Sequence, residues 1–411
     1  MHEEDMDKKV FTYICGNSGP LDDYNPFKIT GEAIVSEILY ILNKEPLTIL
    51  EIASTIKKDK RDVEKAIKSL LKINAIREEN RKYKVNFAIF STDDQKIVFY
   101  IGEQYGKQLA YKLLENRAEL SNLVNTIQCC KYIEKGKIIF ALIGCFALDW
   151  YCLEELEKKG FLRIHKKQPG RREYVLFGAE PLNINVSRLY CRSHNMSTGM
   201  YTFTSFGNAG PRSCLPDILW QASTAVSEHI KGDPDLREIF SNIFSLYGKD
   251  LLNDCGKILE SLALSGEIRS IKNRDVLLNF LEKLKYISKT GKTYKVEIPV
   301  FFPTDRKTIN KINERVSKIV CDFLDKNYLE IKDALSNIRP AINKVPFEEV
   351  FVDVWHKIFG YCNMFLADEG FMFDPPETPY GGRYLAWITV NKKSRNERRA
   401  TSCNRANSHY H

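Results

Sequence analysis

Apolar and polar residues over positions 60–90 alternate in an order that predicts a helix followed by a two-stranded hairpin. Val63, Ile67, Leu70 and Leu71 recur at the helical period, so they share one face of a helix over 60–71. A short strand, a polar charged turn and a second strand with alternating apolar residues then run to Phe90. The pattern therefore predicts a helix with a polar outer face, joined directly to a hairpin.

Two further helices are predicted upstream of this pair of elements. Apolar residues between Ile34 and Leu42 form one stripe of a helix, which Pro46 ends. Thr48 and Glu51 have the spacing of a capping box, which predicts a helix over 49–56. We expect residues 29–92 to form one domain of three helices and a hairpin.

The helix-plus-hairpin pattern occurs at two later places. Residues 151–178 place Pro169-Gly170 at a turn between two strands, and residues 276–301 place Thr290-Gly291 at a hairpin tip. The first and third copies match best, because FAIFSTDDQKIV follows the first hairpin and VFFPTDRKTI belongs to the third. Two explanations stay open: an internal duplication, or the general frequency of helix-hairpin units combined with a shared lysine-rich composition.

The remaining patterns complete an α+β chain. Residues 93–123 predict one or two long helices, 216–230 and 350–366 predict helices, and 201–206 and 384–390 predict strands. The expected order is an irregular N-terminal arm (1–28), the domain already described (29–92), linking or dimerisation helices (93–130), a middle α/β domain that is the candidate sensor (131–232), a C-terminal domain with a further helix-hairpin unit (233–391) and a basic disordered tail (392–411).

Composition indicates a globular class. The chain has 411 residues, 44% of them apolar and 28% charged, which is enough for two or three domains with their own cores. The acidic first residues lack the order of a signal peptide, and the longest apolar run, 138–148, is too short to cross a bilayer. Eleven scattered cysteines do not resemble a disulfide scaffold. We expect a cytoplasmic location, reduced thiols and no membrane partner.

Positive charge concentrates around the predicted helix and hairpin. Residues 57–84 contain eleven Lys or Arg against five Asp or Glu. Arg61 has the planar fork that binds guanine, whereas lysines suit phosphates as point charges, aided by amides at the helix start. The predicted DNA-binding residues lie at the turn, on the outer helix face and at the hairpin tip: Lys57, Lys58, Lys60, Arg61, Lys65, Lys68, Arg81 and Lys82.

At these residues the chain resembles the winged helix-turn-helix transcriptional regulators, particularly the ArsR-type group. The matching parts are PLTILEIASTI, the basic helix KRDVEKAIKSLLKINAI and the hairpin, or wing, REENRKYKVN. The resemblance covers roughly residues 29–92 and implies a transcription factor, usually a homodimer, that occupies operator DNA. Small ArsR-type proteins are nearly all winged helix, whereas about 300 further residues follow here. The second and third helix-hairpin units are then expected to be winged-helix-like.

Members of that family often sense metals, so the cysteines are candidate ligands. No CxxC pair occurs, Cys129 and Cys130 are adjacent, and Cys145 and Cys152 fit core packing. The spacing of Cys191 and His194, near Cys214, is only a two-ligand pattern. We expect no metal and no cofactor.

Enzyme signatures are also absent from the sequence, which contains no GxSxG, HExxH, Walker-type or dinucleotide-binding motif. We therefore expect no catalytic activity. A glycine-rich segment supplies aromatic residues and one arginine that would suit a small effector: Tyr201, Phe203, Phe206 and Arg212.

Together these patterns predict a DNA-binding transcriptional regulator. Its N-terminal winged helix would recognise double-stranded operator DNA, and the remainder would sense a small-molecule effector, form a dimer, or both. The leading alternative is a tandem winged-helix scaffold that binds other proteins and reads no DNA sequence, and an enzyme with an appended winged helix ranks third.

Overall fold

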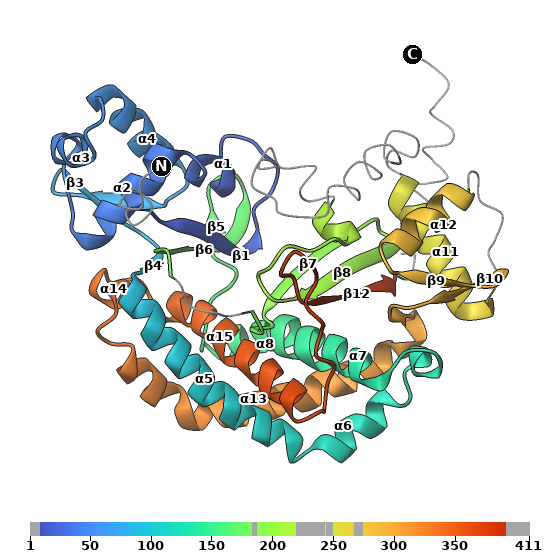
Figure 1. Ribbon diagram of the computed structural model, residues 1–411. Coiled ribbons are helices and arrows are strands. Elements are labelled where there is room, and N and C mark those ends of the chain that lie inside the picture. Colours follow the sequence, from blue (N-terminus) through green and yellow to red (C-terminus); the bar gives the residue numbers. More distant parts are fainter. Residues whose placement is uncertain (1–8, 183–186, 219–242, 244–249, 267–273, 392–411) are drawn as a thin grey trace. The chain divides into compact units, whose positions relative to one another are not determined.

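The chain folds as a mixed α+β protein with two compact units, whose elements are labelled in Figure 1. The computed structural model describes residues 9–182, 187–218, 243, 250–266 and 274–391. Unit 1 comprises residues 1–113, 148–186 and 316–365, and unit 2 comprises residues 114–147, 187–315 and 366–411. Each unit combines three separate segments, in place of the expected linear series of domains. The tail predicted over 392–411 and most of the helix predicted over 216–230 lie outside the described residues.

Unit 1 contains what we call the first helix–hairpin segment, residues 33–85. Its elements are α2 (Ala33–Lys44), α3 (Ile49–Ile56), α4 (Lys60–Lys72), β2 (Ile76–Glu79) and β3 (Lys82–Val85). The predicted capping box at α3 is confirmed: Thr48 N donates to Glu51 Oε2 at 2.7 Å, and Glu51 N donates to Thr48 Oγ1 at 3.3 Å. Satisfying these two amides fixes the start of α3.

A hydrophobic core holds this segment together. The predicted stripe of α4 is buried at Val63, Ile67 and Leu70, and Leu71 is half-buried at its margin. The other elements contribute further buried side chains to the same cluster: Val35, Ile38, Leu39, Leu42, Ile52, Ile76 and Val85. Burying one face of each helix leaves the opposite face of α4 in solvent.

The sheet of unit 1 has the order β1-β6-β4, with a short strand, β5, also paired to β6. Its strands are β1 (Phe11–Asn17), β4 (Ala88–Phe90), β5 (Lys167–Gln168) and β6 (Arg172–Ala179). β1 is antiparallel to β6, and β4 is parallel to it. The prediction of an irregular arm over 1–28 is therefore wrong for β1 and for α1 (Pro26–Thr30). β1 lies at the sheet edge and has no fully buried residue, so its apolar alternation is weak.

Helices make up the rest of unit 1. They are α5 (Thr92–Leu114), α8 (Cys152–Lys158), the later part of α13 (Arg306–Ala334), α14 (Arg339–Ile342) and α15 (Phe347–Asp368). The expected long helices over 93–123 are confirmed as α5 and α6 (Arg117–Val124), and the helix expected over 350–366 is confirmed as α15.

Unit 2 contains the second helix–hairpin segment, residues 251–296. Its described elements are α11 (Leu251–Ser265), α12 (Arg274–Lys283), β9 (Ile287–Thr290) and β10 (Thr293–Val296). The unit's sheet has the order β11-β12-β8-β7, with β12 parallel to β11 and antiparallel to β8. The strands are β7 (Arg192–Ser197), β8 (Tyr201–Gly207), β11 (Val300–Phe301) and β12 (Tyr384–Val390). The strands predicted over 201–206 and 384–390 are confirmed.

The two helix–hairpin segments repeat the same backbone hydrogen bonds 211 positions apart. Ala75 N donates to Leu70 O at 3.0 Å, and Tyr286 N donates to Leu281 O at 2.9 Å. A second bond is also repeated: Asn86 N donates to Ala75 O, and Glu297 N donates to Tyr286 O, each at 2.9 Å. Asn86 and Glu297 are the residues directly after the two hairpins. This match gives a residue-by-residue correspondence between the first and third copies of the sequence pattern.

The repetition extends to the sheets. Gly16 of β1 pairs with Tyr174 of β6, and Gly207 of β8 pairs with Tyr384 of β12. Each glycine begins a matching turn, GNSGP or GNAGP, in which the asparagine Oδ1 accepts a hydrogen bond from the amide of the second glycine, at 2.8 and 3.0 Å. A Cβ at either glycine would collide with the backbone of the neighbouring strand.

Two buried aspartates show the same repetition at the start of the long helices. Asp94 accepts a hydrogen bond from Ser91 N at 2.8 Å and another from Arg339 N at 3.1 Å. Asp305 accepts one from Phe302 N at 2.9 Å and another from Gln128 N at 3.0 Å. Each half of the chain thus supplies the second donor to the aspartate of the other half. The agreement of bonds, turns and caps favours internal duplication over shared composition.

The middle copy of the pattern, residues 151–178, does not belong to this repeat. It does contain a helix, α8, and an antiparallel pair, β5 with β6. However, β6 also pairs with β1 and β4 as an inner strand of a sheet, whereas β2–β3 and β9–β10 are separate two-stranded hairpins. A helix followed by a turn is therefore too short a pattern to distinguish these two arrangements.

The apolar run over 138–148 lies within a longer helical stretch. Three helical elements precede α8: η2 (Gln128–Lys131), α7 (Lys135–Ile139) and η3 (Phe140–Tyr151). η3 has π-helical hydrogen bonding. A further short helix, η6 (Pro303–Asp305), precedes α13. Residues 135–158 are continuous, and by length and composition they qualify as a membrane span, with a mean hydropathy of 1.6. Because 72% of that apolar window is buried inside the protein, it fits a core helix better.

Candidate nucleic-acid interface

α4 presents a row of cationic side chains on the face opposite its buried stripe. Arg61, Lys65 and Lys68 are exposed there, together with Glu64. The spacing of three to four residues places these side chains along one side of the helix. The outer face of α4 thus has the form that the sequence predicted.

All eight predicted DNA-binding residues are exposed, and most are unneutralised. Lys60 Nζ lies 3.5 Å from Glu64 Oε1, and Lys82 Nζ lies 3.9 Å from Glu51 Oε1. The described part of the chain provides no ion pair to the other six: Lys57, Lys58, Arg61, Lys65, Lys68 and Arg81. An exposed cation without an ion pair can bind a phosphate without first breaking an existing pair, so the cost of binding is small.

The start of α4 differs from the expectation that its amides would bind phosphate. Asp59 is the N-cap, and its Oδ1 accepts a hydrogen bond from Arg61 N at 2.7 Å. A carboxylate therefore already occupies the electropositive end of the helix. Any phosphate contact at this place depends on the side chains of Lys57, Lys58 and Lys60.

The hairpin β2–β3 is partly self-neutralised. Glu79 lies 2.9 Å from Arg77 Nε and also pairs with Lys84. The hydrogen bond from Lys84 is the main reason that the pKa of Glu79 is lowered, so this carboxylate stays ionised. Arg81, at the tip with a left-handed backbone (φ 63°), extends beyond these pairs.

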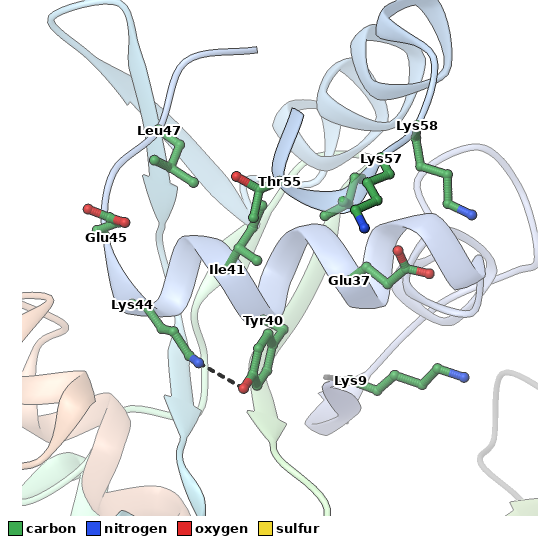
Figure 2. A pocket seen from close by; sticks show the side chains of 11 residues that line it. Lys9, Glu37, Tyr40, Ile41, Lys44, Glu45, Leu47, Thr55, Lys57 and Lys58 are labelled. Carbon is green, nitrogen blue, oxygen red and sulfur yellow. Dashed lines mark hydrogen bonds between the residues drawn. The ribbon is translucent and has the colours of Figure 1, made fainter. Parts of the chain in front are cut away.

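A cationic hollow of about 600 Å³ lies between α2 and the turn from α3 to α4 (Figure 2). Lys57 and Lys58 line it, so these two predicted residues lie at the margin of the α4 face. The sequence did not single out the other charged residues of the hollow, because they come from separate positions: Lys9, Glu37, Lys44 and Glu45. Lys44 Nζ donates a hydrogen bond to Tyr40 Oη at 2.7 Å. Because the partner is a neutral hydroxyl group, this bond does not neutralise the charge of Lys44.

The four residues predicted to bind an effector lie in the interior of unit 2. Tyr201, Phe203 and Phe206 are buried, and Tyr201 packs against Gly256 of α11. Arg212 is also buried and donates to the carbonyl oxygens of Arg192 at 2.8 Å and Asn208 at 2.6 Å. These contacts hold the turn after β8.

The cysteines considered above as metal ligands take part in packing and hydrogen bonding. His194 Nδ1 lies 2.5 Å from Asp217 Oδ1, and Cys214 Sγ donates to Asp217 Oδ2 at 2.8 Å. Burial raises the pKa of Cys152 and of Cys214 well above the usual thiol range, so neither is a thiolate at neutral pH. Within the described residues, no three His, Cys, Asp or Glu side chains converge as metal ligands would.

No protein-family model, curated protein or solved structure matches this chain.

Proposed function

We propose that this protein is a sequence-specific DNA-binding transcriptional regulator and that its first helix–hairpin segment is a winged helix. The observation that carries this proposal is the outer face of α4, where Arg61, Lys65 and Lys68 are exposed without an ion pair in the described part of the chain. A short capped helix precedes α4, and a hairpin with Arg81 at its tip follows it. This is the order of a helix-turn-helix with a wing.

In this proposal α4 enters the major groove of operator DNA. Arg61 reads a guanine through two hydrogen bonds, because only its side chain on this face has the necessary planar fork. The lysines contact phosphates and set the affinity without selecting a sequence. They are Lys57, Lys58, Lys60, Lys65, Lys68 and Lys82, and Arg81 contacts the backbone or minor groove from the hairpin tip.

Substitutions on α4 test the proposal. We expect Arg61→Ala to reduce discrimination at one base position, by about 1–3 kcal/mol. We expect Lys68→Ala to weaken binding to all duplexes alike and to reduce the salt slope by about 1. Fluorescence anisotropy with the operator and its single-base variants measures both effects.

Lys307→Ala provides the matched control, since Lys307 is exposed on α13 in unit 2. It removes one positive charge far along the chain from α4 and should leave both quantities unchanged. Wild-type discrimination and salt slope in both α4 variants would show that this face does not bind DNA.

A second candidate function, a protein-interaction scaffold, is favoured by one observation. The exposed residues of α12 carry no net charge: Arg274, Asp275, Val276, Asn279, Glu282 and Lys283. A neutral face with an exposed valine suits a protein partner better than a phosphate backbone. Under that reading the purified protein would bind operator and scrambled duplexes equally and weakly.

The remaining parts of the proposal concern the rest of the chain. We propose a cytoplasmic location on the basis of composition. We propose a homodimer and a small-molecule effector on the basis of the family resemblance and the sequence pattern. Residues outside the first helix–hairpin segment would serve sensing or assembly. The cationic hollow near Lys57 and Lys58 makes an anionic effector the first class to screen.

A further inference from the structure

The second helix–hairpin segment repeats the last helix and the hairpin of the first, but two exposed lysines of that helix are replaced by uncharged residues. The shared hydrogen bonds place corresponding residues 211 positions apart. Lys65 and Lys68 of α4 then correspond to Val276 and Asn279 of α12, and all four are exposed. α12 therefore lacks counterparts of these two lysines of α4.

The hairpins change in the opposite direction. Residues 72–85 contain five basic and two acidic residues, whereas the corresponding residues 283–296 contain five lysines and no acidic residue. Glu78 and Glu79 of the first hairpin correspond to Lys289 and Thr290 of the second. The second hairpin region thus has the higher net positive charge, because it has as many basic residues as the first and none of the acidic ones.

The lysines of the second hairpin are exposed and little neutralised. Lys285, Lys289 and Lys292 are exposed, and the described residues offer them no ion pair. Lys295 has only a distant partner, since its Nζ lies 3.8 Å from Glu297 Oε1. The first hairpin instead pairs Glu79 with two of its own cations. The hairpin β9–β10 consequently creates a more positive surface potential than the hairpin β2–β3.

We propose that the hairpin β9–β10 is a second DNA-contacting site, which binds the phosphate backbone of a duplex without reading its bases. Ammonium groups bind phosphates as point charges, and this hairpin carries no arginine or amide side chain that would recognise a base edge. The neutral face of α12 leaves the hairpin as the contact. The inference rests on the proposed function, and it assigns base reading to α4 and sequence-independent holding to β9–β10.

The test compares the double variant Lys289→Ala/Lys292→Ala with a matched double variant, Lys307→Ala/Lys311→Ala. The second pair is exposed on α13 in the same unit and removes the same charge. Anisotropy titrations of the full chain with operator and scrambled duplexes, each across a salt series, give the slope of log K against log salt. Each phosphate contact contributes about 0.9 to this slope for duplex DNA.

We expect the hairpin variant to reduce the salt slope by about 2 and to weaken both duplexes by the same factor. The α13 variant should match the wild type, and Lys289→Arg/Lys292→Arg should restore the wild-type slope because the charge is kept. Restoration also shows that the alanine variant has not simply lost its fold.

Each contrary result overturns a different claim. An unchanged slope in the hairpin variant, with Arg61→Ala still altering sequence preference, overturns this inference and leaves the proposed function intact. An equal loss in the α13 variant also overturns it, since the effect is then one of general charge. A wild type without sequence preference, whose slope still falls in the hairpin variant, supports the hairpin contact and removes the regulator.

Discussion

At the scale of single residues, the buried carboxylate of Asp217 ties together neighbouring parts of unit 2. It receives hydrogen bonds from Ser205 Oγ of β8 at 2.6 Å and from Cys214 Sγ, and its other oxygen meets His194 of β7. Arg212 Nη1 donates to the same serine hydroxyl at 3.0 Å. A charge buried in this way is stable only while these partners surround it.

This arrangement predicts a pH-dependent stability. Burial raises the pKa of Asp217, but the hydrogen bond with His194 and the positive charge of Arg212 outweigh it and lower the pKa to about 2. The folded pKa lies below the unfolded value of 3.8, so the stabilisation is complete above pH 3.8 and is lost as the pH falls towards 2. We expect a contribution of about 2 kcal/mol to the free energy of unfolding.

Urea unfolding of the wild type and Asp217→Asn at several pH values between about 2 and 7 measures this contribution. The wild type should lose more stability on acidification than the variant does. Asp250→Asn, at an exposed aspartate, serves as the control. Parallel pH profiles for the wild type and Asp217→Asn would contradict the account.

At the scale of elements, two glycines on one face of α5 allow that helix to lie against α15. A Cβ at Gly102 would stand 2.7 Å from Lys357 Cβ, and one at Gly106 would stand 2.6 Å from Ile358 O. Glycine lowers helix propensity, so in the sequence these two residues only weaken the prediction of a helix. The structure shows that the missing side chains are needed for close packing.

Gly106→Ala should therefore destabilise unit 1 in spite of alanine's better helix propensity. The methyl group meets the backbone of α15, so we expect a net loss of about 1–3 kcal/mol in the free energy of unfolding. Gln108→Ala, at an exposed position two residues later on α5, should change it by less than about 0.5 kcal/mol. Chemical denaturation compares the two, and equal stabilities would show that α5 and α15 are not packed so closely.

Elements with strong local patterns were predictable from the sequence. The capping residues Thr48 and Glu51 gave α3 its correct bounds, and the strand over 384–390 was predicted as observed. β1 was missed because an edge strand needs little apolar alternation. The hollow of Figure 2 was missed because Lys9, Lys44 and Lys57 come from separate parts of the sequence, and they meet only where the segment before β1 and the end of α3 lie beside α2.

At the scale of the whole molecule, the chain repeats one architecture and divides its helices between two units. Asp94 and Asp305 each cap a long helix, and each accepts a further hydrogen bond from the other half of the chain. No local sequence pattern encodes such an exchange, which explains why a linear series of domains was expected. The exchange also links the two halves in folding, because neither unit is complete without both.

The repetition also bears on how one chain would bind DNA. The homodimer that the resemblance implies would supply two winged helices from two chains. Here two helix–hairpin segments belong to one chain, with cations on α4 in the first and on β9–β10 in the second. We therefore propose unlike roles for the two segments, one selecting a sequence and one holding the backbone.

The most direct test of the central claim is the binding of the purified full chain to the DNA upstream of its own gene and to a scrambled duplex across a salt series. The account predicts a clear preference for the upstream sequence and an affinity that falls steeply as salt rises. Equal, weak binding to both duplexes would contradict it and would favour the protein-interaction scaffold.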